Sequence, residues 1–128
     1  MLWSELMSEP LYDRIGGDSA VMAAVDLFYQ KVMSDELTRP FFVGLDMDAQ
    51  VKKQVSFMTW AFGGPSEYKG RDLRTAHAGL VKKGLGDAHF DAVAGHLAAT
   101  LKELGVESAL IQEALGIVGS QRDAVLNR

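Results

Sequence analysis

Few side chains in this chain of 128 residues are able to do chemistry, because it has three histidines and no cysteine. The lack of cysteine excludes disulfides, thiol catalysis, iron–sulfur clusters and thiolate zinc sites. At about 100° per residue, His89 and His96 lie off the apolar stripe of their helix, and we expect both to be solvated. His77 lies on the buried side of its own helix, between Leu73 and Leu80. His77 is therefore the candidate metal ligand, and the alternative is an ordinary core histidine.

Neutral hydrogen-bond donors occur on two other predicted helices. Gln50 and Gln54 share a sector with Phe57, so the inward stripe of that helix is polar for a full turn. Burying two unpaired amides costs about 1–3 kcal/mol each, so they stay inside only where something accepts their hydrogen bonds. Tyr29 lies on an apolar helix face, where its hydroxyl also needs a partner. A histidine facing such donors across a phenylalanine-rich core indicates a haem site, with the imidazole on iron and the donors towards a diatomic ligand.

A second interpretation of the glutamine helix stays open on spacing alone. If this helix is turned about its axis, the glutamines face water and Val51, Val55 and Met58 are buried instead. The chain is then a helical interaction or small-ligand module in which His77 is only a core residue. A di-iron carboxylate bundle is excluded, because it needs Glu-x-x-His pairs and the sequence has none.

The elements that must position these residues are all predicted to be helices. Apolar residues recur at spacings of three and four, and no window alternates over five residues as a half-buried strand would. Asp18 or Ser19, Asp46 or Asp48, and Asp87 are the expected N-caps. The expected helices cover residues 18–34, 46–62, 71–81, 87–104 and 107–126, with a short helical turn over 36–42. This all-α pattern fits a four-helix bundle or a shortened globin and does not choose between them.

The composition is that of one globular domain. The chain weighs 13.9 kDa, is 48% apolar and 23% charged, and has a net charge of −4. This acidic balance argues against binding to a nucleic-acid backbone. The sequence starts without a basic stretch, and it lacks the roughly 18 consecutive apolar residues that a membrane-spanning helix needs. We therefore expect a cytoplasmic protein with neither nucleic acid nor membrane as a partner.

The order and spacing of several short strings resemble one known family. They are LYDRIGG at 11–17, FYQKV at 28–32, FF at 41–42, DMDAQVKKQ at 46–54, FMTWAFGG at 57–64, GRDLRTAH at 70–77, HFDAVA at 89–94 and VLNR at 125–128. Each string is weak alone, but together they resemble the truncated haemoglobins of group I over nearly the whole chain. The resemblance implies a two-over-two globin fold for residues 11–128, preceded by an N-terminal extension of residues 1–10.

The same resemblance implies a role for each matching residue. His77 would be the proximal ligand of haem iron, and Tyr29 the distal residue whose hydroxyl donates to bound oxygen. Gln50 and Gln54 would complete the distal hydrogen-bond network, and Arg74 would pair with a haem propionate. The apolar lining of the pocket would comprise Phe42, Phe57, Met58, Leu73, Leu80 and Leu97.

Two departures from some relatives bear on the cofactor. Lys53 stands where some relatives have a histidine that occupies the sixth iron position. A lysine does the same only when neutral, at a cost of about 4–5 kcal/mol at pH 7, so the alternative role is an ion pair with a propionate at the pocket mouth. Some relatives also attach haem through a histidine of the last helix, whereas residues 118–122 contain none. We therefore expect non-covalent haem b.

The expected function follows from this pocket. Neutral donors aimed at bound oxygen, which has partial superoxide character, favour tight binding and slow release, each such bond being worth about 1.5–3 kcal/mol. The resemblance implies binding of O2, NO and CO, and the chemistry that suits slow release is oxidation of nitric oxide to nitrate, a nitric oxide dioxygenase activity. The sequence has no flavin or nicotinamide motif, so an external reductase would return the iron to its ferrous form. Oxygen storage or transport, ligand sensing and peroxide chemistry are the alternatives, and we expect a monomer.

Overall fold

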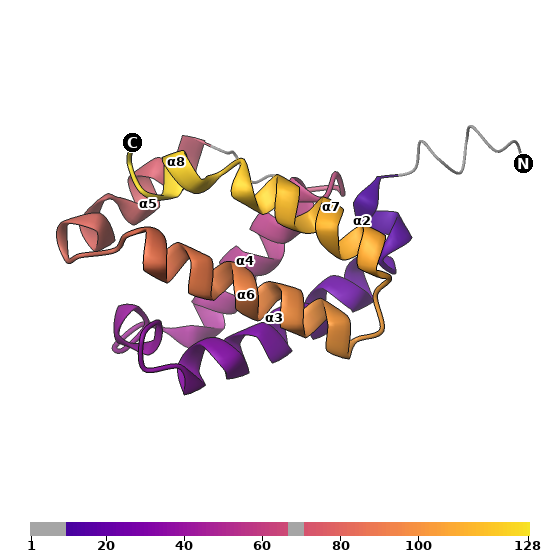
Figure 1. Cartoon of the computed structure of the whole chain (residues 1–128), viewed down its shortest axis with the longest axis horizontal. Helices are drawn as coiled ribbons and strands as arrows, with labels where there is room; N and C mark the ends of the chain where they lie inside the picture. The colour runs from indigo at the N-terminus through magenta and orange to yellow at the C-terminus, as the bar shows by residue number, and fades with distance from the viewer. Residues whose placement is uncertain (1–9, 67–70) are drawn as a thin grey trace, which may run out of the picture.

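The computed structural model describes residues 10–66 and 71–128, and every regular element in these ranges is a helix. The elements are α2 (Leu11–Arg14), α3 (Gly17–Ser34), η1 (Arg39–Phe41), α4 (Met47–Ala61), α5 (Arg71–Lys82), α6 (Asp87–Glu103), α7 (Ser108–Gly119) and α8 (Arg122–Val125) (Figure 1). The prediction of an all-α fold is confirmed. In the described ranges, no helix is both long enough and apolar enough to cross a bilayer. Most of the predicted N-terminal extension, residues 1–9, lies outside the described ranges.

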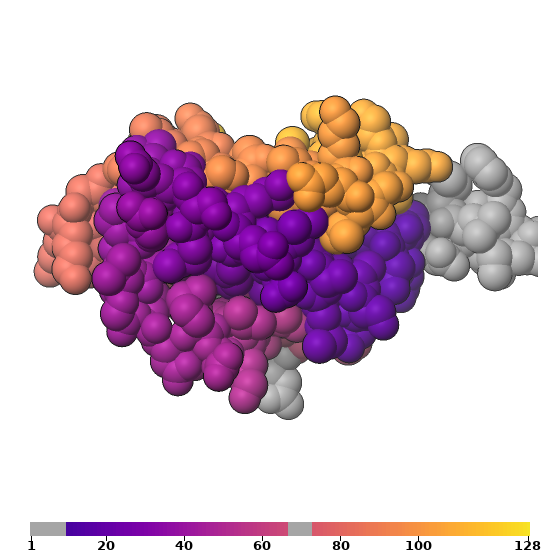
Figure 2. Space-filling view, turned by 90° about the horizontal axis from the view of Figure 1, so that it is seen from below, coloured from indigo at the N-terminus to yellow at the C-terminus, as the bar shows by residue number. Residues whose placement is uncertain are grey.

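Helix α3 forms the centre of the fold. It packs against α4 on one side and α6 on the other, while α7 returns antiparallel along α6 (Figure 1). Figure 2 shows α3 along one face of the molecule, between α4 and the α6–α7 pair. The core that joins these helices includes Val25, Val32 and Leu101, each at most 1% exposed. Helix α5 differs, because its main packing partner among the described elements is the short helix α8.

The helix starts were predicted with mixed success. Asp46 caps α4 as expected, since its Oδ1 accepts from the backbone N–H groups of Asp48 and Ala49. Asp18, Ser19 and Asp87 do not act as caps. Gly16, with φ +121°, precedes α3. At the start of α6, Nδ1 of His89 accepts from the N–H of Gly86 at 3.0 Å, so a side chain of the first turn satisfies the donor of the residue that precedes the helix.

The prediction of one continuous last helix is wrong. Instead of one helix over 107–126, the chain forms α7 and α8, separated at Ser120 and Gln121. The physical reason lies in Gly119 and Ser120, since glycine has a low helix propensity and the Ser120 hydroxyl donates to the carbonyl of Ile117. The short turn predicted over 36–42 is realised as the single 3₁₀ turn of η1.

Gly64, which follows α4, allows a close contact with Tyr12 of α2. A Cβ at Gly64 would lie 2.5–2.8 Å from three ring atoms of the Tyr12 side chain. The backbone N–H of Tyr12 also donates to the carbonyl of Phe62 at 2.8 Å. Helix α2 is therefore fixed against the end of α4, which carries the predicted distal residues.

Candidate functional site

His77 is presented by α5 in the form that a metal ligand requires. Its Nδ1 lies 2.7 Å from the main-chain oxygen of Leu73, one turn earlier in the helix. A carbonyl only accepts hydrogen bonds, so Nδ1 holds the proton and Nε2 of the neutral ring has a free lone pair. A histidine whose second nitrogen donates to a carbonyl is the usual arrangement of a metal-bound imidazole. The half-buried His77 therefore fits an iron ligand better than an isolated core histidine.

Tyr29, on α3, is a buried donor held by a glutamine. The residue is 5% exposed, and its phenol oxygen accepts from Nε2 of Gln50 on α4 at 3.2 Å. The ring packs edge-on against Phe28 and Phe42, with centroid distances of 5.2 and 5.7 Å. Burial raises the pKa of the Tyr29 hydroxyl, and the bond from Gln50 offsets part of this rise. The phenol is therefore protonated at neutral pH and has its proton available for a ligand.

The rest of the polar stripe of α4 divides between the interior and solvent. Gln54 is half-buried, and its side-chain amide has no hydrogen-bond partner in residues 10–66 and 71–128. Lys53 is exposed and forms no ion pair within those same ranges. On the opposite sector, Met58 is buried, whereas the nearby valines at 51 and 55 are half-buried. Neither of the two predicted rotations of this helix is therefore realised in full, because both sectors are partly covered.

The predicted apolar lining is split between two parts of the fold. Met58 and Leu97 belong to the buried core that includes Tyr29, and Phe42 and Phe57 pack against that core while remaining half-buried. Leu73 and Leu80 belong to α5, where Leu73 is buried and Leu80 half-buried. Large apolar side chains that are only half-buried fit a pocket that a flat apolar group would cover. With an imidazole lone pair on α5 and donors on α3 and α4, this set fits a haem.

Arg74 has a contact that the sequence did not reveal. It is exposed, and its Nη2 donates to the main-chain oxygen of Arg128 at 3.1 Å, while Nδ2 of Asn127 donates to the main-chain oxygen of Arg74 at 3.1 Å. Its predicted propionate contact stays a prediction. The spacing of four between Leu73 and His77 contained the signal for the ring-orienting carbonyl, but no spacing pointed to Asn127.

The expectation that His89 and His96 are solvated is wrong. Nε2 of His96 lies 2.7 Å from Oδ2 of Asp35, and the His89 ring packs edge-on against Phe41 in addition to its bond with Gly86. The N–H of Leu37 and the contact with His96 lower the pKa of the Asp35 carboxyl. Throughout the described part of the chain, no three His, Cys, Asp or Glu side chains gather as a metal site. His77 therefore stays the candidate histidine for a metal.

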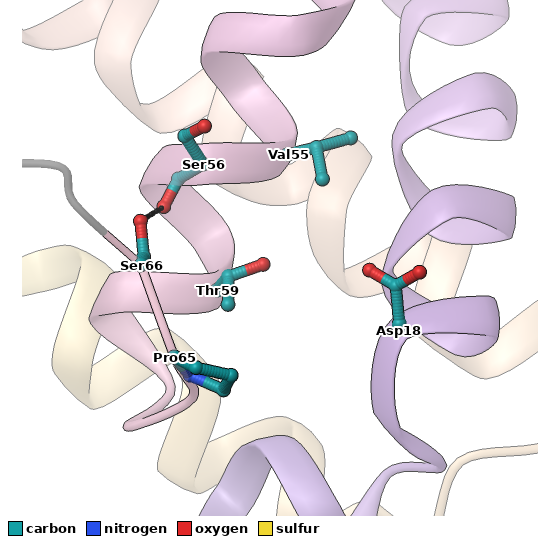
Figure 3. Close-up of a pocket in the computed structure, with 6 residues that line it drawn as sticks. All are labelled: Asp18, Val55, Ser56, Thr59, Pro65 and Ser66. Atoms are coloured by element: carbon teal, nitrogen blue, oxygen red, sulfur yellow. Dashed lines mark hydrogen bonds between the residues drawn. The ribbon is translucent and has the colours of Figure 1, made fainter.

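A cavity of about 540 Å³ lies elsewhere, between the start of α3 and the second half of α4 (Figure 3). It is lined by Asp18, Val55, Ser56, Thr59, Pro65 and Ser66. None of these is a predicted haem-site residue. The hydroxyl of Ser66 closes one side of it by donating to the main-chain oxygen of Ser56 at 2.9 Å.

Comparisons with known proteins agree with this geometry. Residues 10–127 match the family model described as bacterial-like globin. A group 1 truncated haemoglobin of Tetrahymena pyriformis is 45% identical over 95% of this chain and 100% of the relative, and one of a Synechocystis species is 48% identical over 92% and 98%. Among solved structures, the Fe(III) form of the Tetrahymena protein has a TM-score of 0.86 at 46% identity, covering 92% of this chain and 98% of its own. The 2/2 haemoglobin of a Synechococcus species, solved with covalently attached haem, has a TM-score of 0.89 at 49% identity, covering 94% and 100%.

This two-over-two helical chain therefore belongs to the bacterial-like globins and, among them, to the group 1 truncated haemoglobins. The predicted family and the predicted fold class are both confirmed.

Proposed function

We propose that the chain binds one haem b without a covalent bond, binds O2, NO and CO through it, and supports oxidation of nitric oxide to nitrate with an external reductase. Membership of the globin family implies the haem and a small gaseous ligand. A bound haem supplies an iron that takes diatomic ligands and exchanges one electron. The chain's own residues determine how firmly such a ligand is held.

The observation that supports this proposal best is the bond between Nδ1 of His77 and the carbonyl of Leu73. It leaves Nε2 as a ligand for iron and fixes the plane of the ring. The decisive experiment is the absorption spectrum of the purified, reduced protein with and without O2. An intense Soret band that shifts on oxygenation is expected, whereas a colourless protein that takes up no added haem would contradict the proposal.

Tyr29 and Gln50 support the ligand-binding part of the proposal. Gln50 occupies the phenol oxygen as an acceptor, so the phenol proton of Tyr29 is left to donate to a ligand. Solved structures of the Tetrahymena relative include variants at one tyrosine and two glutamines, separated by 21 and 4 residues along that chain. Tyr29, Gln50 and Gln54 have the same separations, which supports a shared distal network.

Non-covalent attachment is proposed from the histidines of this chain. The covalently attached haem of the Synechococcus relative shows that both modes need consideration. Residues 118–122 contain no histidine, and His89 and His96 already have partners on the protein. Extraction with acidic organic solvent should therefore remove all of the pigment. Pigment that stays with the denatured chain would contradict this assignment.

Lys53 is proposed to pair with a haem propionate at the pocket mouth. Its exposure supports this role, because a charged ammonium stays in water while the stem of the side chain covers apolar surface. The competing role is the sixth iron ligand. A low-spin six-coordinate spectrum of the ligand-free protein, lost in Lys53→Ala, would favour ligation, and an unchanged five-coordinate spectrum would favour the propionate.

Oxidation of nitric oxide is proposed because strong donors to the ligand suit a reaction better than transport. Rapid mixing of the oxygenated protein with nitric oxide should convert it to the ferric form and yield one nitrate per haem. Release of oxygen without nitrate would favour storage or sensing instead. Turnover beyond one cycle should require an added electron donor, since no flavin or nicotinamide motif is present in the 128 residues.

A further inference from the structure

We propose that Asn127 and Arg74 form a clasp that positions the imidazole of His77. The clasp is defined as the two hydrogen bonds between these residues and the main chain: Asn127 Nδ2 to the Arg74 oxygen, and Arg74 Nη2 to the Arg128 oxygen, both at 3.1 Å. Only the role towards iron rests on the proposed function; the coupling between the clasp and the ring does not.

Helix α5 depends on this clasp because its other attachments are few. Whereas α3, α4, α6 and α7 share a continuous buried core, none of residues 73–82 of α5, the ones whose side chains are described, belongs to that core. Its extensive packing within the described ranges is with α8, which lies beside it in Figure 1. The two clasp bonds join α5 to the residues that directly follow α8.

The backbone of Asn127 is shaped for this bond. Its φ is +59°, and it is the one non-glycine residue with a positive φ in the described parts of the chain. Asparagine tolerates this left-handed conformation better than most residues. This turn of the backbone brings the side-chain amide to the first turns of α5, where it donates to the Arg74 oxygen.

The clasp binds the carbonyl next to the one that orients His77. The oxygen that accepts from His77 belongs to Leu73, and the oxygen that accepts from Asn127 belongs to the next residue, Arg74. These two carbonyls belong to adjacent peptide groups that meet at the Cα of Arg74. A shift of the Arg74 carbonyl reaches the Leu73 carbonyl through the φ and ψ angles of Arg74, which the hydrogen bonds of the helix restrain. The orientation and basicity of a metal-bound imidazole follow from its second hydrogen bond, which makes Asn127 a positioning residue.

The clasp is anchored to the body of the fold by charged side chains. The guanidinium of Arg128 donates from both terminal nitrogens to Asp87, at 2.9 and 3.1 Å, and Arg122 donates to Asp87 at 3.1 Å and to Asp91 at 2.6 Å. Arg122 also lies 4.5 Å above the ring of Phe90. The bonds from Arg128 and Arg122 hold the pKa of the Asp87 carboxyl below its usual range. The C-terminal segment therefore connects the start of α6 to α5.

Two substitutions at one position separate the amide from the backbone shape. Asn127→Asp keeps the shape of the side chain but removes the donor, and Asn127→Gly removes the amide while keeping the left-handed backbone accessible. Gln121→Glu is the matched control, an amide-to-carboxylate change in the same segment, at a residue whose side-chain amide donates to the neighbouring Ser120 hydroxyl. In both Asn127 variants, backbone hydrogen exchange in α5 should accelerate about tenfold, with α3 and α6 unchanged. The control should match the wild type.

The ring itself is read in two ways. In the haem-loaded protein, the iron–imidazole stretching band should move in both Asn127 variants and not in Gln121→Glu. In the chain without haem, nitrogen NMR of His77 should show a smaller population with the proton on Nδ1. Faster exchange of α5 with an unmoved band and unchanged ring signals would reduce the clasp to a structural role and overturn the proposal. Unchanged exchange of α5 in both Asn127 variants would also overturn it. A protein that never takes up haem would contradict the proposed function, while exchange and NMR would still decide the coupling.

Discussion

The two sides of the predicted haem site are stabilised by different interactions. Tyr29, on the distal side, belongs to the buried core of α3, α4 and α6. His77, on the proximal side, belongs to α5, which is attached to the fold through the C-terminal segment and its exposed arginine–aspartate pairs. Apolar burial responds little to acid or salt, whereas exposed ion pairs are weakened by both. We therefore expect the structure of the distal side to change little with pH and salt, and the structure of α5, which carries His77, to respond to both.

The largest effect is expected from His77→Gly, which removes the only proximal ligand that we propose. The purified variant should lose the Soret band, and added imidazole should restore part of it by occupying the vacated volume. The measurement is the haem absorbance per protein. His89→Ala, which also removes an imidazole but outside the site, should keep its pigment, and an unaltered band in His77→Gly would assign iron to another residue.

The next effect tests the buried side. Leu101, on α6, is 1% exposed in the core shared with α3, so Leu101→Ala should lower the free energy of unfolding by about 2–5 kcal/mol. Urea unfolding measures it. Met22, on α3 but 56% exposed, gives the control, and Met22→Ala should stay within about 0.5 kcal/mol. A small loss in Leu101→Ala would show that the distal side does not depend on burial.

A smaller change is expected in ligand binding from Tyr29→Phe. This substitution keeps the ring contacts with Phe28 and Phe42 and removes only the donor. Loss of a hydrogen bond worth about 1.5–3 kcal/mol accelerates O2 release by about one to two decades. Stopped-flow dissociation of O2 is the measurement. An unchanged rate would remove Tyr29 from the distal network.

The smallest effect should come from acid, and it should distinguish the two sides. Because the pKa of Asp87 is lowered in the folded chain, its stabilising contribution is complete above the ordinary aspartate value of 3.8 and is lost as the pH falls below it. The protection factor of the α5 amides, which is the intrinsic exchange rate at each pH divided by the observed rate, should therefore fall on acidification. In Asp87→Asn it should be low already at neutral pH and change less.

Asp35→Asn is the matched control for that experiment. The pKa of Asp35 is lowered too, but this carboxylate pairs with His96 on α6 and not with the arginines of the C-terminal segment. Its loss should leave the acid response of α5 intact. An equal response of α5 to both substitutions would show that the two sides are not independently held.

The sequence predicted the parts of the molecule that depend on local spacing. The spacing of apolar residues by three and four predicted where the helices lie, and Asp46 predicted the start of α4. The pair of His96 with Asp35 spans 61 residues and that of Asn127 with Arg74 spans 53, so no local pattern encodes either. These partners become visible only when the helices are packed, which explains why two histidines were misjudged as solvated.

Side-chain pairing also bears on the prediction that Asp87 caps α6, which was wrong. Asp87 was expected to cap α6, but it is the first residue inside the helix and its carboxylate is bound by Arg122 and Arg128. The residue before the helix is Gly86, whose N–H donates to His89. A side chain that fits two roles takes the one that the folded neighbours offer. Sequence spacing shows which roles a side chain is able to take, but not which residues lie beside it in the folded chain.

The contact between Gly64 and Tyr12 leaves no room for a side chain at position 64. The Tyr12 ring fills the volume that any side chain at position 64 would occupy, so even a methyl group there forces the ring or the adjoining backbone to move. The lack of a Cβ at Gly64 therefore allows α2 to pack against the end of α4. Variation at this position should be purged in any library screened for folded protein, however conservative the replacement.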